Sequence, residues 1–115
     1  PFERDVHTDH LYVSKASQAC IKTFRNSYVK KVLAYETISE TDFNFMKGEK
    51  FKAQIFFDIS KFLTKKIEIC KVYKSEISKH PFPRSISSIK SLAKLRGSQS
   101  GFKAAEAFQL LFEKI

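Results

Sequence analysis

The sequence predicts an α/β protein with two to three strands and about three helices. Two short apolar segments, 31–36 and 53–59, are bounded by polar residues, which is typical of strands. Apolar residues recur at helical spacing before and after the second of these segments. In addition, 43% of the 115 residues are hydrophobic and 14% are aromatic, so the chain has the composition of a single compact domain.

The first predicted helix follows an irregular polar segment, Pro1–His10, and ends near Arg25–Asn26. Its apolar residues lie at helical spacing, and we expect them to form a buried face. This face comprises Val13, Ala16, Cys20 and Phe24. Two cysteines do not make a disulfide framework at this length, so we expect Cys20 and Cys70 to be buried, reduced thiols.

A strand is predicted over Lys31–Glu36, followed by a polar loop over Thr37–Lys52. The next segment, Ala53–Ile59, is predicted to be a buried strand because it contains three consecutive large apolar residues. The following helix is expected to be capped by Asp58 or Ser60, with the prolines of His80–Pro83 ending it. Its expected buried face comprises Ile59, Phe62, Leu63, Ile67, Cys70 and Tyr73.

A third helix is predicted over Ile86–Arg96, with Ser85 as its N-cap and Gly97 as its terminator. Its expected inward residues are Ile89, Leu92 and Ala93. The last segment, Phe102–Ile115, has helical spacing of its apolar residues, yet its Phe-Gln-Leu-Leu-Phe core also suits a strand. Both interpretations remain open at this point.

The formal net charge is +9, from 21 Lys and Arg against 12 Asp and Glu. Such a charge attracts polyanions, but the lysines are scattered and arginine, which binds phosphate through two nitrogens, is scarce. The pattern therefore favours a lysine-rich solvated surface and no nucleic-acid partner. No apolar run approaches the ~20 residues of a membrane span, and no secretory signal pattern opens the sequence, so we expect a cytoplasmic location.

One short motif, His7-Thr8-Asp9-His10, combines residues that carry chemistry. Imidazole is a common zinc ligand, and a neighbouring carboxylate can fix the tautomer of a histidine ring. The spacing alone is equally compatible with a solvated pair of histidines. A zinc site also needs three or four protein ligands, and His80, the third histidine of the chain, lies in a proline-flanked loop. The chain therefore offers no obvious closed metal site of its own.

An ordered series of short motifs extends over nearly the whole chain. Together it resembles the PIG-L/LmbE-like zinc-dependent N-acetylglucosaminyl deacetylases. The motifs are Asp5-Val6-His7-Thr8-Asp9-His10, Val32–Glu36, Phe57–Ser60, Lys65–Glu68, Tyr73–Ser75, Leu95–Gly101 and Ala105–Phe108. The resemblance implies a Rossmann-like fold of which residues 1–115 are the C-terminal half. The family's N-terminal His-Pro-Asp-Asp-Glu motif, which supplies two zinc ligands and the general base, has no match here.

The resemblance assigns roles by position. His10 would be the third Zn²⁺ ligand, and His7 would face the substrate amide. As an imidazolium, His7 would stabilise the oxyanion or protonate the leaving amine, while Asp9 would orient His7 and favour its charge. Arg96 is a candidate for contact with the substrate or a neighbouring subunit. Ala104 departs from the family pattern, which often has an aromatic residue there.

The function that the resemblance implies is zinc-dependent hydrolysis of the N-acetyl group of an N-acetylglucosamine-type conjugate. The reaction would release acetate and a free amino sugar. We expect the isolated chain to be inactive, because the N-terminal half would have to come from a longer chain or a separate polypeptide. The resemblance also suggests a trimer or hexamer. The alternative is a non-catalytic remnant that acts in binding or assembly, with an anionic partner held by the lysine-rich surface.

Overall fold

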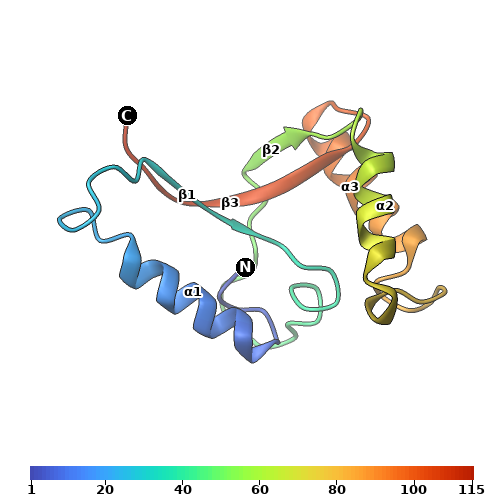
Figure 1. The fold of residues 1–115 in the computed structure, drawn as a ribbon, viewed down its shortest axis with the longest axis horizontal. Helices are drawn as coiled ribbons and strands as arrows, with labels where there is room; N and C mark the ends of the chain where they lie inside the picture. Colours follow the sequence, from blue (N-terminus) through green and yellow to red (C-terminus); the bar gives the residue numbers. More distant parts are fainter. The chain divides into compact units, whose positions relative to one another are not determined.

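The computed structural model describes residues 1–115 and confirms an α/β protein with three α-helices and a three-stranded antiparallel sheet. Figure 1 shows the elements in chain order. They are α1 (Thr8–Cys20), β1 (Lys31–Tyr35), β2 (Ile55–Asp58), α2 (Leu63–Val72), the 3₁₀ turn η1 (Lys74–Glu76), α3 (Ile86–Ser100) and β3 (Ala105–Glu113). None of the helices combines the length and the apolar character that crossing a membrane requires.

The chain divides into two compact units, which are described separately. The first unit contains residues 1–55 and 108–115, and the second contains residues 56–107. The first unit therefore holds α1 and β1, whereas α2, η1 and α3 belong to the second. Both β2 and β3 contribute residues to each unit.

The strands have the order β1-β3-β2 in the sheet. β1 is antiparallel to β3, with Lys31 opposite Glu113 and Tyr35 opposite Phe108. An ion pair of 2.6 Å joins Lys31 Nζ to Glu113 Oε1 at the end of this ladder. The last segment of the chain is thus a strand, and its alternate residues Ala105 and Ala107 are buried. A period of two in burial is the strand pattern, and it prevails here over the helical spacing of the apolar residues.

In the first unit, α1 begins at Thr8 and ends at Cys20, so the predicted bounds and the predicted buried face are both wrong. Ser14 is the buried residue of this helix, while Val13 is half exposed and Phe24 lies beyond the helix end with 78% exposure. Cys20 is an exposed free thiol, which corrects its predicted burial. The helix begins early because a polar side chain caps it before the first apolar residue of the pattern.

The core of the first unit lies instead between its first residues and β1. Phe2 is buried, and its backbone N–H donates to the carbonyl of Tyr35 at 3.0 Å. The ring of Phe2 meets Phe51 edge to face, with centroids 5.7 Å apart, and Ala34 of β1 is buried. These contacts fix the segment that leads into α1.

In the second unit, α2 begins later than predicted. The carboxylate of Asp58 accepts hydrogen bonds from the backbone N–H and hydroxyl of Ser60 and so stabilises a turn, while Phe62 occupies the N-cap position without a side-chain bond. Ile67 is the buried residue of α2. The expected burial of Phe62 and Tyr73 is wrong, since both are more than 60% exposed. The helix ends at Val72, before the prolines predicted to end it, and the free thiol of Cys70 is only partly buried.

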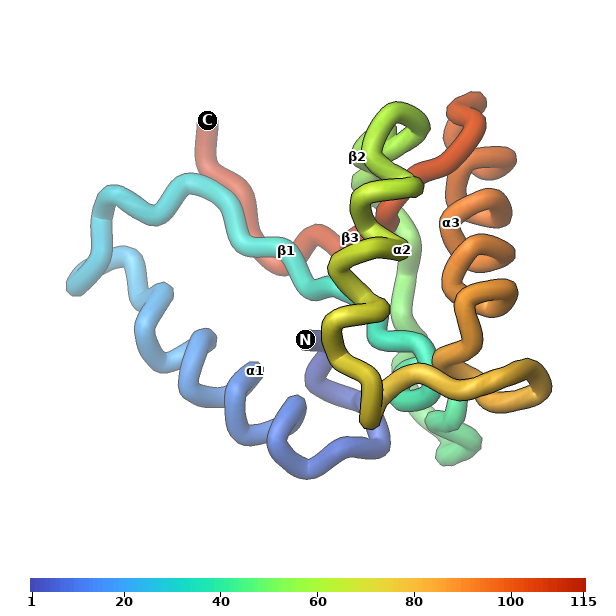
Figure 2. The backbone as a smooth tube through the Cα atoms, turned by 45° about the vertical axis from the view of Figure 1, so that its right-hand side comes forward, coloured from blue at the N-terminus to red at the C-terminus, as the bar shows by residue number.

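The predicted N-cap of α3 is confirmed, because Ser85 Oγ accepts a hydrogen bond from Ser88 N at 3.1 Å. Gly97, the predicted terminator of α3, does not end the helix. The helix continues to Ser100 and ends at Gly101, which has φ 78°. Gly97 instead allows a close approach, since a Cβ there would lie 2.6 Å from the carbonyl oxygen of Phe102. Figure 2 shows α2 and α3 side by side, and Ile89 and Ala93 of α3 are buried.

β2 confirms the second predicted strand over a shorter range, but the strand is not buried as expected. Ile55 and Phe56 are half-buried, whereas Phe57 is half exposed and Asp58 is exposed. The backbone N–H of Gln54 donates to the carbonyl of Phe108, and that of Ile59 donates to the carbonyl of Ala104. β2 is therefore an edge strand of the sheet, beside β3.

Candidate functional site

The motif histidines lie at the start of α1, in the first unit. His7 is the N-cap residue, and its ring Nδ1 accepts a hydrogen bond of 3.2 Å from the backbone N–H of Asp9. This bond satisfies one of the free N–H groups of the first turn, so His7 starts the helix. His10 follows three residues later on the same helix face. The two rings stack with centroids 5.2 Å apart and an angle of 25° between their planes.

Asp5 is the buried group behind this pair, and its side chain has no exposed surface. Its Oδ2 lies 2.7 Å from His10 Nδ1, and its Oδ1 accepts a hydrogen bond of 2.6 Å from the hydroxyl of Thr41. The Thr41 hydroxyl oxygen itself accepts from the backbone N–H of Thr37 at 2.8 Å. A chain of hydrogen bonds therefore runs from the loop after β1 to the ring of His10.

Sequence reasoning missed this role of Asp5 and Thr41. Asp5 stands in the motif that carries the family resemblance, but its carboxylate had no assigned partner there. Thr41 lies 36 residues further along the chain, in a segment predicted only as a polar loop. No spacing rule connects two such positions, because the fold of the loop brings them together.

Asp9 contacts His7 through its backbone. Its carboxylate Oδ2 is 4.0 Å from His7 Nδ1, too far for a hydrogen bond, and its side chain is 79% exposed. The Nδ1 atom receives the Asp9 backbone N–H instead. The assignment of Asp9 as a charge partner for His7 therefore stays a prediction.

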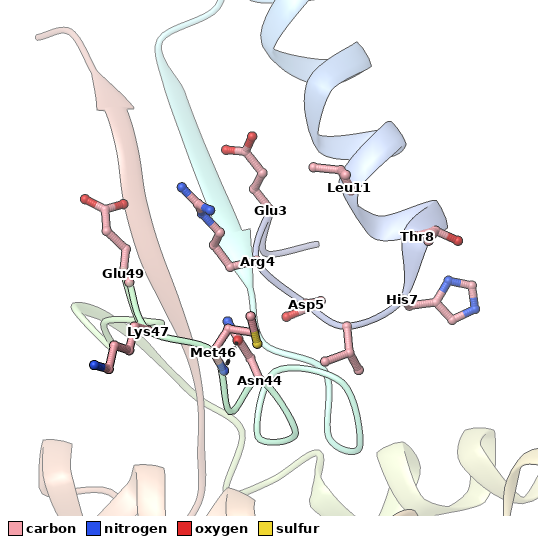
Figure 3. A pocket seen from close by; sticks show the side chains of 12 residues that line it. Glu3, Arg4, Asp5, His7, Thr8, Leu11, Asn44, Met46, Lys47 and Glu49 are labelled. Carbon is pink, nitrogen blue, oxygen red and sulfur yellow. Dashed lines mark hydrogen bonds between the residues drawn. The ribbon is translucent and has the colours of Figure 1, made fainter.

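A cavity of about 290 Å³ adjoins this site within the first unit (Figure 3). Its wall includes Asp5 and His7 on one side and the loop 44–49 on the other. In the view of Figure 3, the His7 ring lies at the margin of the group, away from Lys47 and Glu49. The full lining comprises Glu3, Arg4, Asp5, Val6, His7, Thr8, Leu11, Asn44, Met46, Lys47, Gly48 and Glu49. The lining combines charged side chains of both signs with the apolar side chains of Val6, Leu11 and Met46.

The loop that lines this cavity is held by hydrogen bonds between its side chains and its backbone. Lys50 Nζ donates to the carbonyl oxygen of Met46 at 2.9 Å and also to that of Asn44. The side-chain oxygen of Asn44 accepts from the backbone N–H of Met46 at 3.2 Å. Gly48 has φ 132°, a conformation that favours glycine. The sequence predicted a loop here but no role for it in a site.

Arg96 and Ala104 belong to the second unit. The guanidinium of Arg96 donates from Nη1 to Gln99 Oε1 at 2.9 Å on the surface of α3. Ala104 is 2% exposed, and its amide lies beside the position that a Cβ of residue 97 would take. The small side chain at 104, where the family pattern often has an aromatic one, therefore matches the close packing around Gly97.

One side chain, that of Asp58, has a clearly shifted pKa. In the second unit, hydrogen bonds from Ser60 hold the pKa of Asp58 below its usual value of 3.8.

The donor set for a metal is incomplete within this chain. Residues 1–115 contain no group of three or more His, Cys, Asp or Glu side chains arranged to hold a metal ion. His10 on its own has the surroundings of a zinc ligand, because a carboxylate contacts its Nδ1 and leaves Nε2 for the metal. His80 lies in the second unit. His10 could therefore supply one metal ligand.

Comparison with known proteins does not assign the chain to a family. No protein-family model matches it, and neither a curated protein nor a solved structure is similar enough to count as a match.

Proposed function

We propose that this chain supplies part of the site of a zinc-dependent N-deacetylase. The reaction is hydrolysis of the N-acetyl group of an N-acetylglucosamine-type conjugate. The observation that carries the proposal is the contact of 2.7 Å between Asp5 Oδ2 and His10 Nδ1. In zinc sites, the ring nitrogen of a ligating histidine that does not bind the metal is commonly hydrogen-bonded to a carboxylate.

His10 is the zinc ligand in this proposal. Its side chain is 21% exposed, so the ring is held on the Asp5 side and still reaches solvent. Zinc, when bound, supplies Lewis-acid activation of water and of the acetyl carbonyl group. His10 holds its ring in a fixed orientation for this purpose, because the helix, the stacking on His7 and the Asp5 contact all restrain it.

His7 is the catalytic residue in this proposal, and it acts on the substrate amide. Its side chain is 49% exposed, and its ring lies beside that of His10. Water would add to the acetyl carbon and lose a proton to the carboxylate base of the N-terminal half, and that proton would pass to the amine nitrogen as the C–N bond breaks. A ring N–H of His7 would donate to the carbonyl oxygen as negative charge develops there, a contribution worth ~3–4 kcal/mol in comparable sites.

The rest of the site would come from the N-terminal half that the resemblance implies. That half would add two zinc ligands and the carboxylate that takes the proton of the attacking water. In this proposal it would also add further strands to the antiparallel sheet β1-β3-β2, and the Rossmann-like fold of the whole is part of the proposal. The N-terminal half belongs either to the same natural polypeptide or to a separate one.

The cavity beside His7 is the candidate position for the sugar conjugate. It adjoins Asp5 and His7, and its lining offers both cations and anions for hydroxyl groups. A ligand there would contact the loop 44–49 on the side opposite to α1 (Figure 3).

Two substitutions in the natural polypeptide that contains this chain test the proposal. With His7→Ala we expect loss of acetate release from an N-acetylglucosamine conjugate and retention of zinc. With His10→Ala we expect loss of both. An exposed histidine outside the site, His80→Ala, is the matched control and should retain both. Wild-type zinc content and turnover in both site variants would favour the alternative of a non-catalytic binding or assembly module.

A further inference from the structure

The two stacked histidines differ in what occupies their Nδ1 atoms. At His10 the neighbour is the buried carboxylate of Asp5, 2.7 Å away. At His7 the neighbour is the backbone N–H of Asp9, 3.2 Å away. A neutral imidazole carries one proton, so the atom that Nδ1 faces decides which nitrogen keeps it.

The hydrogen-bond chain behind Asp5 supplies a donor to its other carboxylate oxygen, Oδ1. The backbone N–H of Thr37 donates to the Thr41 hydroxyl oxygen, so the single hydroxyl proton of Thr41 is free to donate to Asp5 Oδ1. An ionised carboxylate accepts at both oxygens and donates at neither. With Asp5 ionised, His10 donates from Nδ1 to Asp5 Oδ2, and its Nε2 bears the lone pair.

The direction of the bond at His7 is opposite. A backbone N–H can only donate, so Nδ1 of His7 must offer its lone pair to Asp9 N. In the neutral ring the proton is then on Nε2. The same hydrogen bond therefore caps helix α1 and selects the tautomer of His7.

We propose that these contacts hold the two histidines in opposite tautomers, and that Asp5 is a positioning residue acting on His10. His10 presents an Nε2 lone pair and His7 presents an Nε2–H donor from the adjacent ring. The consequence for metal binding rests on the proposed function, whereas the tautomers themselves do not.

This arrangement divides two tasks between neighbouring rings. The His10 Nε2 atom suits a metal ion, and the His7 Nε2–H suits an oxygen that accepts a hydrogen bond. His7 is thereby unsuited to be a second ligand of the same metal as long as its cap bond persists. The pair favours a ligand that brings an acceptor oxygen next to the metal, such as the carbonyl group of an amide.

Nitrogen NMR of the 115-residue chain with ¹⁵N-labelled histidine tests the tautomers directly. Long-range proton–nitrogen correlations distinguish the protonated ring nitrogen from the bare one. At a pH where both rings are neutral, we expect Nδ1–H for His10 and Nε2–H for His7. Observation of Nε2–H at His10, or of the same tautomer in both rings, would overturn the proposal.

The role of Asp5 is tested by Asp5→Ala, with Asp9→Ala as the control. Loss of the Asp5 carboxylate should shift His10 towards Nε2–H, whereas loss of the Asp9 carboxylate should leave both tautomers unchanged, since the backbone donor persists. An unchanged His10 tautomer in folded Asp5→Ala would contradict the assigned role. If this variant does not fold, the wild-type spectrum still decides whether His10 donates to the carboxylate.

The metal consequence is tested with Zn²⁺ alone, in the natural polypeptide. Asp5→Ala should weaken zinc binding by about 10–100-fold, the range seen when the carboxylate behind a ligating histidine is lost. An unchanged zinc affinity would overturn the positioning role. If the tautomers are as described but no deacetylation occurs, the proposed function alone is wrong. If deacetylation occurs but the tautomers are reversed, this inference alone is wrong.

Discussion

The carboxylate of Asp5 lies 2.7 Å from Nδ1 of His10, although Asp5 precedes α1 and His10 belongs to its first turn. The contact spans the helix start, where His7 forms the cap, so the cap residue and the buried carboxylate fix two neighbouring rings at once. The geometry of the candidate site is therefore a consequence of how α1 begins.

Thr41→Val should destabilise the first unit. The substitution removes the hydroxyl that donates to the buried Asp5 Oδ1 and that accepts from Thr37 N, so two polar groups lose their partner. Each loss of this kind costs about 1–3 kcal/mol. Urea unfolding should show a lower free energy of unfolding than Thr23→Val, the same change at an exposed position. Equal stability of the two variants would contradict the hydrogen-bond chain.

Gly97→Ala should destabilise the second unit by about 1–3 kcal/mol, the usual cost of overpacking. A Cβ at this position would meet Phe102 O at 2.6 Å and Ala104 N at 2.8 Å, and both are backbone atoms that cannot rotate away. Ser98→Ala, an exposed change in the same helix, is the control and should have little effect. A stability gain in Gly97→Ala, as helix propensity alone would give, would show that the close approach is absent.

Ser85→Ala should cost about 0.5–2 kcal/mol, because it removes the N-cap of α3. Ser85 is also buried, and its hydroxyl lies 2.8 Å from that of Ser88, which would lose this contact too. Thermal unfolding followed by circular dichroism measures the change, and Ser91→Ala in the exposed part of α3 gives the baseline. Identical melting of the two variants would argue against the cap.

Asp58 should make stability depend on pH in the acidic range. Hydrogen bonds from Ser60 lower the pKa of Asp58 below 3.8, so the folded state favours the carboxylate. Its stabilising contribution is fully present above 3.8 and is lost as the pH falls through the lower folded-state value. The difference in unfolding free energy between wild type and Asp58→Ala should thus be largest near neutrality and shrink below pH 3.8. A difference that is constant with pH would contradict this origin.

The sequence was informative where a local rule decided the structure. Ser85 predicted the start of α3 because a serine cap acts within one turn, and the loop before β2 followed from its polar composition. The start of α1 was mispredicted because the apolar pattern begins at Val13, whereas the cap that sets the helix is a histidine further upstream. Burial was mispredicted at Phe24 and Phe62, since an apolar spacing does not show whether another element covers that face.

The candidate site was predictable only in part. The pair His7 and His10 was visible as a motif, and helical spacing brings the two rings onto one face. The hydrogen bonds from Thr41 through Asp5 depend on the loop after β1, so they could not be derived from spacing. The same holds for the cavity wall of residues 44–49, because a loop has no periodicity that places its side chains.

Zinc-dependent acetate release is the most direct test of the proposed function. The chain, together with the N-terminal half that the proposed function requires, would be stripped with a chelator and assayed on an N-acetylglucosamine conjugate before and after zinc is restored. We predict that stripping abolishes acetate release, that zinc restores it, and that residues 1–115 alone release none. Acetate release that survives complete removal of zinc, or full turnover by residues 1–115 alone, would contradict the account.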